Sequence, residues 1–424
     1  MKCIIQFFLI LNTLNLLGQE TAIEIGYKYK LESEVLEETR SINVYLPHSY
    51  KSTTHTSYPV IYLMDGDYNF HYVTGLMDQL AVISERIPEM IIVGIDDKGH
   101  ADYVKNRTPY DKENNPTGNS ELFLDYLLNE VKPYIKSRYK VSDFDVLIGH
   151  SLGGLFTINT LLQEPESFEN YIAISPSLWW NDFNSEKEVE AFFKKHEKID
   201  KRLYLSIGNE MGMGVLGFQN QIDINTFADA YYKNEPLDLE YEFNIFKEEN
   251  HNSVGLISIK TALEKMFENY ELPKDIIENI KTFEEYDVYL REYQKKIGDG
   301  FQLPKRQFKY VLTKIYENDK ENLEKVEQKI KDSYRASLGD YCNYTGNIYL
   351  TNGDLEKAKN LLQKSCEVSP TSLENIVSLS EMYLKEENKE KAKILYEKAL
   401  KMAIDQKASN WYLNQLESNV RKLE

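Results

Sequence analysis

The sequence predicts an α/β protein with a mostly parallel central sheet, followed by an all-α region. Short, continuous apolar runs, typical of strands that are buried on both faces, recur through the first 250 residues. These runs lie at 60–64, 91–95, 146–148, 171–174 and 203–207. Helical patterns over 122–139 and 155–162 separate them, and strands that alternate with helices indicate an α/β fold.

Two further strands are expected between residues 20 and 47. Polar and apolar residues alternate over Ala22–Tyr27 and over Ser41–Leu46, the pattern of a half-buried strand. Pro47 and a stretch rich in serine and threonine then indicate a loop that ends near Thr56.

The composition is that of a globular protein and excludes several classes. Of the 424 residues, 42% are hydrophobic and 28% are charged, which argues against a disordered chain. The net charge of -18 disfavours a nucleic acid or an anionic membrane as partner, because both need a positive field. After residue 20, no apolar run reaches the roughly 18 residues that span a bilayer. Three cysteines cannot form a disulfide scaffold.

The first residues have the pattern of a secretion signal. Met1 and Lys2 precede an apolar stretch that continues to Leu17, and Gly18 is a small residue at a suitable cleavage point. Residues 1–18 are therefore predicted to be a signal peptide, and the mature protein is expected in the periplasm or outside the cell. An uncleaved N-terminal anchor is the alternative.

Beyond about residue 275 the sequence becomes charged and helical. A segment that begins at Tyr349 aligns with one that begins at Tyr383, and the offset of 34 residues is the period of a tetratricopeptide repeat. Ala358 and Ala392 occupy the position of tight helix contact in the two copies. The alternative is two amphipathic helices with a chance period. The repeats are a candidate surface for a protein partner.

These boundaries divide the chain into four parts. They are a signal peptide (1–18), an α/β domain (19–275), a helical linker region (276–330) and tetratricopeptide-like repeats (331–424). Cys342 and Cys366 fall on the two helices of one repeat, where packed small residues are expected more often than a redox pair.

The strongest local motif is Gly149-His150-Ser151-Leu152-Gly153, which fits G-x-S-x-G. A buried strand precedes it and a helix follows it, as a nucleophile elbow requires. This strand–turn–helix unit predicts that the α/β domain is an α/β-hydrolase with Ser151 as the nucleophile.

A serine nucleophile needs a base, and α/β-hydrolases order the triad as serine, acid, histidine. Only His196 and His251 follow Ser151. His196 sits in a charged helical surface, whereas His251 follows the strand-like 241–246, so His251 is the predicted base.

The acid that orients the base should follow the preceding strand. Glu210 stands just after the run at 203–207 and is the predicted acid. Asp200 precedes that strand and Asp223 falls in the next helix. An exposed loop carboxylate is the alternative role for Glu210.

An oxyanion hole needs two backbone N–H groups. One is expected from Leu152, the residue after the nucleophile. The other is expected from the loop after the strand at 60–64, where the N–H of Asp67 is the candidate and Gly66 the neighbour that could replace it.

No metal or organic cofactor is predicted. Gly212–Gly217 fits G-x-G-x-x-G, but it does not begin at the end of a strand in the way that a dinucleotide fingerprint does. It is interpreted as a flexible loop at the rim of the site. The histidines are dispersed and show no metal-ligand spacing.

Together with these motifs, other segments carry a resemblance to the putative esterase family of α/β-hydrolases. The similar segments are 58–66, 92–96, 107–109, 149–154, 175–180 and the stretch around His251. The family includes S-formylglutathione hydrolases, siderophore, feruloyl and acetyl-xylan esterases, and mycolyltransferases, and the likeness covers roughly residues 25–270. The family often has Asp where this chain has Glu210.

The resemblance implies that Ser151 is nucleophile, His251 base and Glu210 acid. It also implies that Trp179 and Trp180 wall the acyl or leaving-group pocket, with core packing as the alternative. Arg107 would meet an anionic substrate or form a structural ion pair.

The sequence thus predicts a secreted serine esterase that works through an acyl-enzyme. One alternative is an acyltransferase of the same fold. The other is a non-catalytic platform that binds proteins through the C-terminal repeats.

Overall fold

The computed structural model describes residues 23–424 except 54, 181–184, 197–198, 235–239, 299 and 407. The predicted signal peptide, residues 1–18, lies outside the described residues. In the part that is described, no helix is long and apolar enough to cross a membrane.

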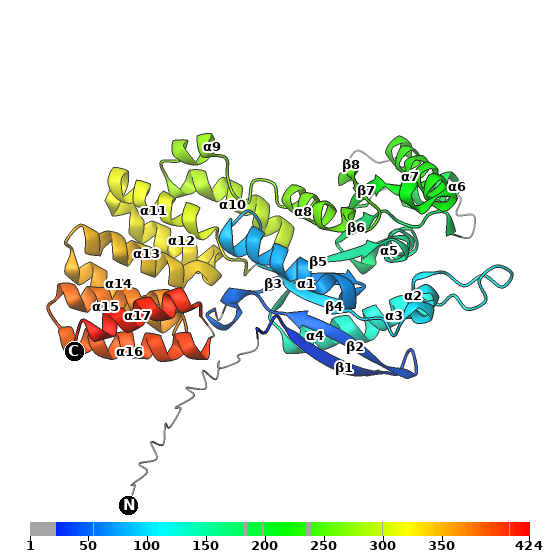
Figure 1. The fold of residues 1–424 in the computed structure, drawn as a ribbon. Helices are drawn as coiled ribbons and strands as arrows, with labels where there is room; N and C mark the ends of the chain where they lie inside the picture. Colours follow the sequence, from blue (N-terminus) through cyan, green and yellow to red (C-terminus); the bar gives the residue numbers. More distant parts are fainter. Residues whose placement is uncertain are drawn as a thin grey trace, which may run out of the picture.

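A mixed sheet forms the centre of the N-terminal part (Figure 1). The strands within the described ranges are β1 (Tyr27–Ser33), β2 (Glu38–Tyr45), β3 (Tyr58–Met64), β4 (Ile91–Ile95), β5 (Val141–His150), β6 (Asn170–Ile174), β7 (Arg202–Asn209) and β8 (Glu240–Asn250). Their order across the sheet is β1-β2-β4-β3-β5-β6-β7-β8. β2 runs antiparallel to both of its neighbours, β1 and β4. All other neighbouring strands, from β4 through β3 to β8, pair in parallel. The predicted α/β fold with a mostly parallel sheet is therefore confirmed, and the continuous apolar runs are its buried central strands.

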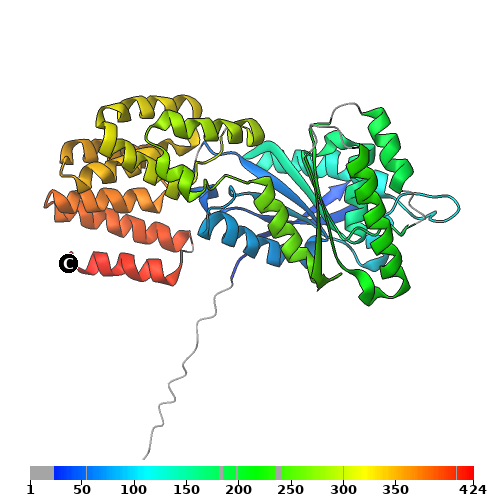
Figure 2. The same cartoon turned by 90° about the horizontal axis from the view of Figure 1, so that it is seen from above.

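Helices cover both faces of this sheet (Figure 2). One face packs against α1 (Gly66–Met77) and α8 (Val254–Met266). The other face packs against α3 (Ser120–Tyr126), α4 (Lys132–Arg138), α5 (Leu152–Gln163), α6 (Ser185–Lys195) and α7 (Val215–Asn234). Successive residues of β3 alternate between the two cores: Ile61 and Leu63 face α1, and Tyr62 faces the α5 side.

Two elements of the structure differ from the elements that the sequence predicts. The strand expected over Ala22–Tyr27 is wrong, because β1 begins only at Tyr27, which pairs with Val44 near the end of β2. Among the described residues, 23–26 pair with no strand, since β2 ends at Tyr45 and the chain then leaves the sheet. The single helix expected over 122–139 is α3 and α4 joined by a π-helical segment at Leu127–Val131.

The C-terminal region is all-α. Its helices are α9 (Lys274–Asn279), α10 (Phe283–Ile297), α11 (Lys305–Asp319), α12 (Leu323–Ser333), α13 (Leu338–Thr351), α14 (Leu355–Val368), α15 (Leu373–Lys385), α16 (Lys389–Asp405) and α17 (Asn410–Arg421).

The 34-residue repeat corresponds to two helical hairpins, α13–α14 and α15–α16. The second helix of each hairpin is capped in the same way, by the side chains of Asp354 and Asn388. Ala358 and Ala392 are both fully buried where helices pack closely. Cys342 and Cys366 are free cysteines, and burial raises the pKa of the Cys342 thiol to about 12.

The hydrophobic core continues without a break from the sheet into the helical region. Phe144 of β5 contacts Phe267 after α8 with ring centroids 5.6 Å apart, and Phe308 of α11 contacts Tyr344 of α13 at 6.3 Å. The hydroxyl of Tyr293 in α10 donates to the carbonyl of Phe267 at 3.0 Å. Helices of the predicted linker region, 276–330, therefore share one core with the face of the sheet that carries α1 and α8.

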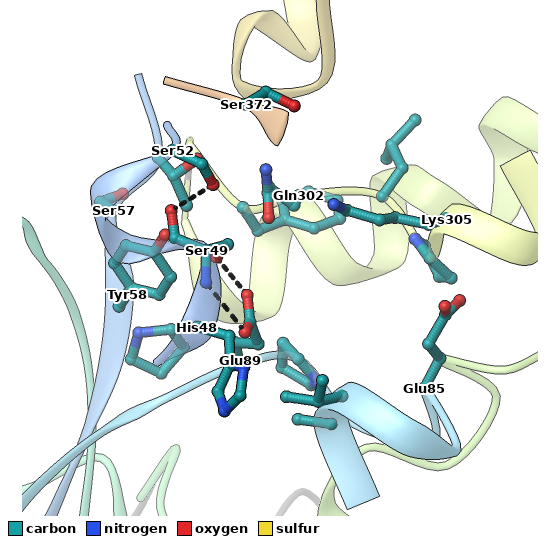
Figure 3. Close-up of a pocket in the computed structure, with 18 of the residues that line it drawn as sticks. His48, Ser49, Ser52, Ser57, Tyr58, Glu85, Glu89, Gln302, Lys305 and Ser372 are labelled. Carbon is teal, nitrogen blue, oxygen red and sulfur yellow. Dashed lines mark hydrogen bonds between the residues drawn. The ribbon is translucent and has the colours of Figure 1, made fainter. Parts of the chain in front are cut away.

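A polar cavity of about 270 Å³ lies at this junction (Figure 3). Ser52 and Glu89 reach it from the sheet side, Lys305 from the start of α11, and Ser372 from the start of α15. Asp340 raises the pKa of the Lys305 ammonium despite its burial, with Glu374 acting in the same direction. Glu89 and Glu85, from the sheet side, also raise the pKa of Lys305, so charges of both parts of the chain meet at the junction.

Removing a ring from the shared core should destabilise the protein. Phe308 is fully buried, so Phe308→Ala is expected to lower the free energy of unfolding by about 3–5 kcal/mol, through lost transfer energy and a cavity. Urea denaturation followed by circular dichroism measures this. Phe308→Leu should cost clearly less, and exposed Ile394→Ala is the control. Equal midpoints for Phe308→Ala and Ile394→Ala would contradict a packed junction.

Candidate active site

A strained turn between β5 and α5 presents Ser151. Its backbone has φ 58° and ψ -119°, a conformation that few L-residues adopt. Two hydrogen bonds hold the turn against the loop after β6: the N–H of Ser151 donates to the carbonyl of Ile174, and the N–H of Ser177 donates to the carbonyl of Ser151, both at 3.0 Å. The side chain of Ser151 is thereby fixed at the carboxyl edge of the sheet.

Glycines allow the close contacts around this turn. A Cβ on Gly149 would lie 2.0 Å from the carbonyl oxygen of Gly153. A Cβ on Gly153 would lie 2.9 Å from Asp65 Oδ2, next to α1. The G-x-S-x-G pattern therefore reflects the packing of backbone against backbone as well as the position of the serine.

The structure brings Ser151, His251 and Glu210 together, although they are far apart in the sequence. His251 Nε2 lies 3.0 Å from Ser151 Oγ, and His251 Nδ1 lies 2.7 Å from Glu210 Oε2. A carboxylate only accepts, so Nδ1–H of His251 donates to Glu210, and Nε2 is left to accept from the serine hydroxyl. In this tautomer His251 can act as a general base toward Ser151.

Glu210 is completely buried at the end of β7. Burial alone would raise the pKa of Glu210, but the hydrogen bond from His251 and the nearby Ser175 and Asn220 outweigh it and hold the pKa below its ordinary value. Glu210 is therefore ionised and stabilises a proton on His251.

The G-x-G-x-x-G segment serves the packing of this acid. Gly214 has a positive φ of 68°, and a Cβ on Gly217 would lie 1.8 Å from the carbonyl oxygen of Glu210. The glycines thus let α7 begin directly against the residue that holds His251.

His150 supports the histidine from the other side. His150 Nε2 lies 2.7 Å from the carbonyl oxygen of His251 and donates to it, and the two rings are 4.7 Å apart. Burial, with His251 acting in the same direction, lowers the pKa of His150 to about 4. The ring of His150 is therefore neutral at pH 7 and fixes the backbone of His251.

Both predicted oxyanion donors are at helix N-termini, and Asp67 lines the same cavity as Ser151. Leu152 begins α5, and Asp67 is the second residue of α1. The N–H of Leu152 is occupied in this structure, because it donates to the hydroxyl of Tyr103 at 3.2 Å. The N-terminal ends of two helices add positive potential at this point.

A cavity of about 570 Å³ opens over the serine, a size typical of small-molecule sites. Its lining comes from the start of α1 and the residue before it, from the loops after β4 and β8, from the turn at the end of β5, and from α2 (His100–Arg107). The lining residues are Asp65, Asp67, Tyr68, Asn69, Asp97, Gly99, His100, Tyr103, His150, Ser151, His251 and Asn252.

Three predicted pocket residues do not line this cavity. Trp179 and Trp180 are partly buried with rings 5.5 Å apart, and Trp180 packs against the core on the α5 side. Arg107 has no exposed surface and its guanidinium lies 2.9 Å from Asp97 Oδ1. The predicted contact of Arg107 with an anionic substrate is therefore wrong. Arg107 instead forms the structural ion pair that was its alternative role, and this buried pair neutralises its charge.

Several lining residues were missed by the sequence analysis. Tyr103 and His100 lie on α2, in a segment with no strand or strong periodicity to place it. Asp97 is the second residue after β4, and its position at the carboxyl end of a parallel strand is the signal that could have identified it. In the described part of the chain, no group of three or more His, Cys, Asp or Glu side chains could hold a metal ion.

Comparison with known proteins places the chain among esterases. Residues 33–253 match the model of a family described as putative esterase, and residues 341–372 and 373–403 match tetratricopeptide repeats. The chain is 35% identical over 153 residues to a siderophore triacetylfusarinine C esterase of Aspergillus fumigatus, which covers 34% of this chain and 52% of that protein. It is 27% identical over 252 residues to the ferri-bacillibactin esterase of Bacillus subtilis, covering 53% and 84% of the two chains.

A solved structure is also similar. An IroE-like serine hydrolase from Shewanella oneidensis has a TM-score of 0.58 at 26% identity, and the match covers 70% of this chain and 95% of that one. The chain spans only about half the length of the Aspergillus relative. The fold and the family are shared with these proteins.

The neutral state of His150 predicts a pH dependence of stability. Its pKa is about 4 when folded and about 6.5 when unfolded, so the unfolded chain binds more protons between these values. The free energy of unfolding should therefore fall as pH falls through this window, by up to about 3 kcal/mol from this group. In His150→Gln the fall between pH 7 and pH 4.5 should be smaller, by about 2 kcal/mol.

Urea denaturation at several pH values measures this difference. Gln keeps a donor for the carbonyl of His251, and His71→Gln on the exposed side of α1 is the matched control. Identical pH slopes for His150→Gln and the wild type would contradict a buried neutral His150.

Proposed function

Because the chain belongs to the putative esterase family, we propose that it is a serine esterase that hydrolyses a carboxylic ester through an acyl-enzyme. The observation that carries this proposal is the hydrogen-bonded series from Ser151 Oγ to His251 Nε2 at 3.0 Å and from His251 Nδ1 to Glu210 at 2.7 Å. Ser151 is the nucleophile, His251 the general base and Glu210 the acid that orients it.

The acylation step follows from these positions. Ser151 Oγ forms a bond with the ester carbonyl carbon while its proton moves to His251 Nε2, and the carbonyl π electrons move to the oxygen. The tetrahedral intermediate then collapses, the bond to the alcohol oxygen breaks, and the alcohol leaves with the proton from His251. Glu210 remains ionised and stabilises the imidazolium during both events.

Backbone N–H groups of Leu152 and Asp67 stabilise the oxyanion. In the free protein the hydroxyl of Tyr103 accepts the Leu152 N–H, so the substrate carbonyl oxygen has to take its place. Water, activated by His251, attacks the acyl-enzyme in the same way and releases the acid. An acyltransferase would differ only in the alcohol that replaces this water.

The names of two relatives make siderophore esters the first substrates to test. We also propose that residues 1–18 direct the chain to the periplasm or the outside of the cell, and that the C-terminal repeats bind a protein partner.

A fluorophosphonate probe tests the nucleophile directly. The wild type should form a covalent adduct on Ser151, located by mass spectrometry, because its hydroxyl is activated by His251. Ser151→Ala and His251→Gln should lose labelling and ester turnover, whereas His196→Gln, which changes the other histidine after Ser151, should keep both. A non-catalytic platform would leave the wild-type serine unlabelled.

The role of Glu210 has a separate test. In Glu210→Gln the side-chain amide donates toward His251 Nδ1 and favours the tautomer whose Nε2 carries the proton, so His251 can no longer accept from Ser151. We expect kcat to fall by about 10³–10⁴ with a smaller change in KM. Steady-state assay of a p-nitrophenyl ester measures this, and Asp223→Asn in α7 is the control. Wild-type kcat in Glu210→Gln would refute the assignment.

A further inference from the structure

We propose that the cavity over Ser151 selects esters that carry a positive charge close to the scissile bond, on either the alcohol or the acyl part. This inference rests on the proposed esterase function and adds a substrate class to it. Two observations support it: the side chains that line the cavity are acidic, and the nearby basic side chains already form ion pairs within the protein.

The lining of the cavity is acidic. Asp65, Asp67 and Asp97 contribute carboxyl groups, and no lysine or arginine is among the residues that line it. His150 is neutral at pH 7 because of its lowered pKa. The side chains that a substrate meets beside Ser151 therefore include three acids and no permanent cation.

Basic residues near the cavity are already paired with acids of its lining or with acids behind it. Arg107 lies behind the wall, without exposed surface, 2.9 Å from Asp97 and 3.6 Å from Asp65. Arg40 is 2.7 Å from Asp102, and Lys98 is 2.8 Å from a carboxylate on β2. Arg107 thus pairs with two acids of the lining, and Arg40 and Lys98 pair mainly with acids outside it, so none of these cations is free to bind an anionic substrate.

One of the lining carboxylates, Asp67, has no ion-pair partner among the described residues. Asp67 is exposed at the start of α1, and the described residues place no basic group within ion-pair distance of its carboxylate. Asp65 is only 7% exposed; its Oδ1 has no hydrogen-bond partner in the described structure but lies 3.6 Å from Arg107 Nε. Asp67 is thus the carboxylate of the lining that a cationic group of a substrate can reach and pair with.

The net charge of the lining is negative in either protonation state of Asp65. Burial raises the pKa of Asp65, with Asp97 and Asp67 acting in the same direction and Arg107 against. If Asp65 is protonated, Arg107 balances Asp97 and Asp67 keeps one negative charge. If Asp65 is ionised, a second negative charge is added.

The negative charge of the lining affects the stability of the oxyanion that forms during the reaction. A developing oxyanion on the substrate is repelled by the carboxylates that line the cavity, which raises the barrier for a neutral ester. A cation held between Asp67 and Asp97 offsets that repulsion while it binds. The rings of Tyr68, His100 and Tyr103 also line the cavity, and aromatic faces favour ammonium groups.

Isosteric esters separate charge from shape. Acetylcholine is compared with 3,3-dimethylbutyl acetate, which replaces nitrogen by carbon, and with 4-acetoxybutanoate, which carries a carboxylate. For charge on the acyl side, ethyl 4-(trimethylammonio)butanoate is compared with ethyl 5,5-dimethylhexanoate. One negative charge at about 6 Å in water-like surroundings changes kcat/KM about threefold.

We expect kcat/KM for the cationic ester to exceed that for its neutral isostere by about three- to tenfold in at least one pair, and the anionic ester to be the poorest of its series. The preference should shrink in 1 M salt, where the screening length falls to about 3 Å.

Two variants assign the preference to the cavity. Asp67→Asn removes a charge but keeps the backbone N–H of residue 67, and it should lower the cationic-to-neutral ratio about threefold. Asp143→Asn removes an almost fully exposed charge near the start of β5, at the opposite edge of the sheet from Ser151, and should leave the ratio unchanged.

A ratio of one or less in both pairs, with hydrolysis intact, would overturn this inference alone. An unchanged ratio in Asp67→Asn would do the same. Absence of hydrolysis of every ester, with Ser151 unlabelled by fluorophosphonate, would overturn the proposed function and this inference together.

Discussion

The site depends on the backbone at Ser151, which is held at a positive φ between β5 and α5. A conformation that is costly for a residue with a side chain persists only where the surroundings fix it. Here the carbonyl of Ile174 and the N–H of Ser177 hold the turn from the neighbouring strand, and Gly149 has no Cβ to collide with the next turn. His251, Glu210 and the N-termini of α1 and α5 are useful only because the serine hydroxyl is fixed at this point.

The fold and the positions of Ser151, Glu210 and His251 could be predicted because each depends on local pattern. Strands buried on both faces must be apolar throughout, so β3, β4 and β6 stand out in the sequence. Parallel strands then bring their following loops to one edge, and chain order alone places an acid after β7 and a histidine after β8.

The walls of the cavity could not be predicted in this way. Tyr103 and His100 reach the site from α2, a short helix without strong periodicity whose last residue, Arg107, pairs with Asp97. A sequence does not reveal whether adjacent aromatic residues face a cavity or the core; neither Trp179 nor Trp180 lines the cavity, and Trp180 packs against the core. Edge strands are equally weak signals, because the end of β1 is set by the length of its partner.

The C-terminal helical region is connected to the active site through α8, which packs against it. This helix begins at Val254, three residues after His251, and its buried face lies in the core that the sheet shares with the C-terminal helices. At the other end of α8, Phe267 contacts Phe144 of β5 and accepts a hydrogen bond from Tyr293 of α10. Phe144 lies on the same strand that ends at His150. The strand that presents the serine and the end of the helix that follows the histidine therefore meet in the core that the C-terminal helices share.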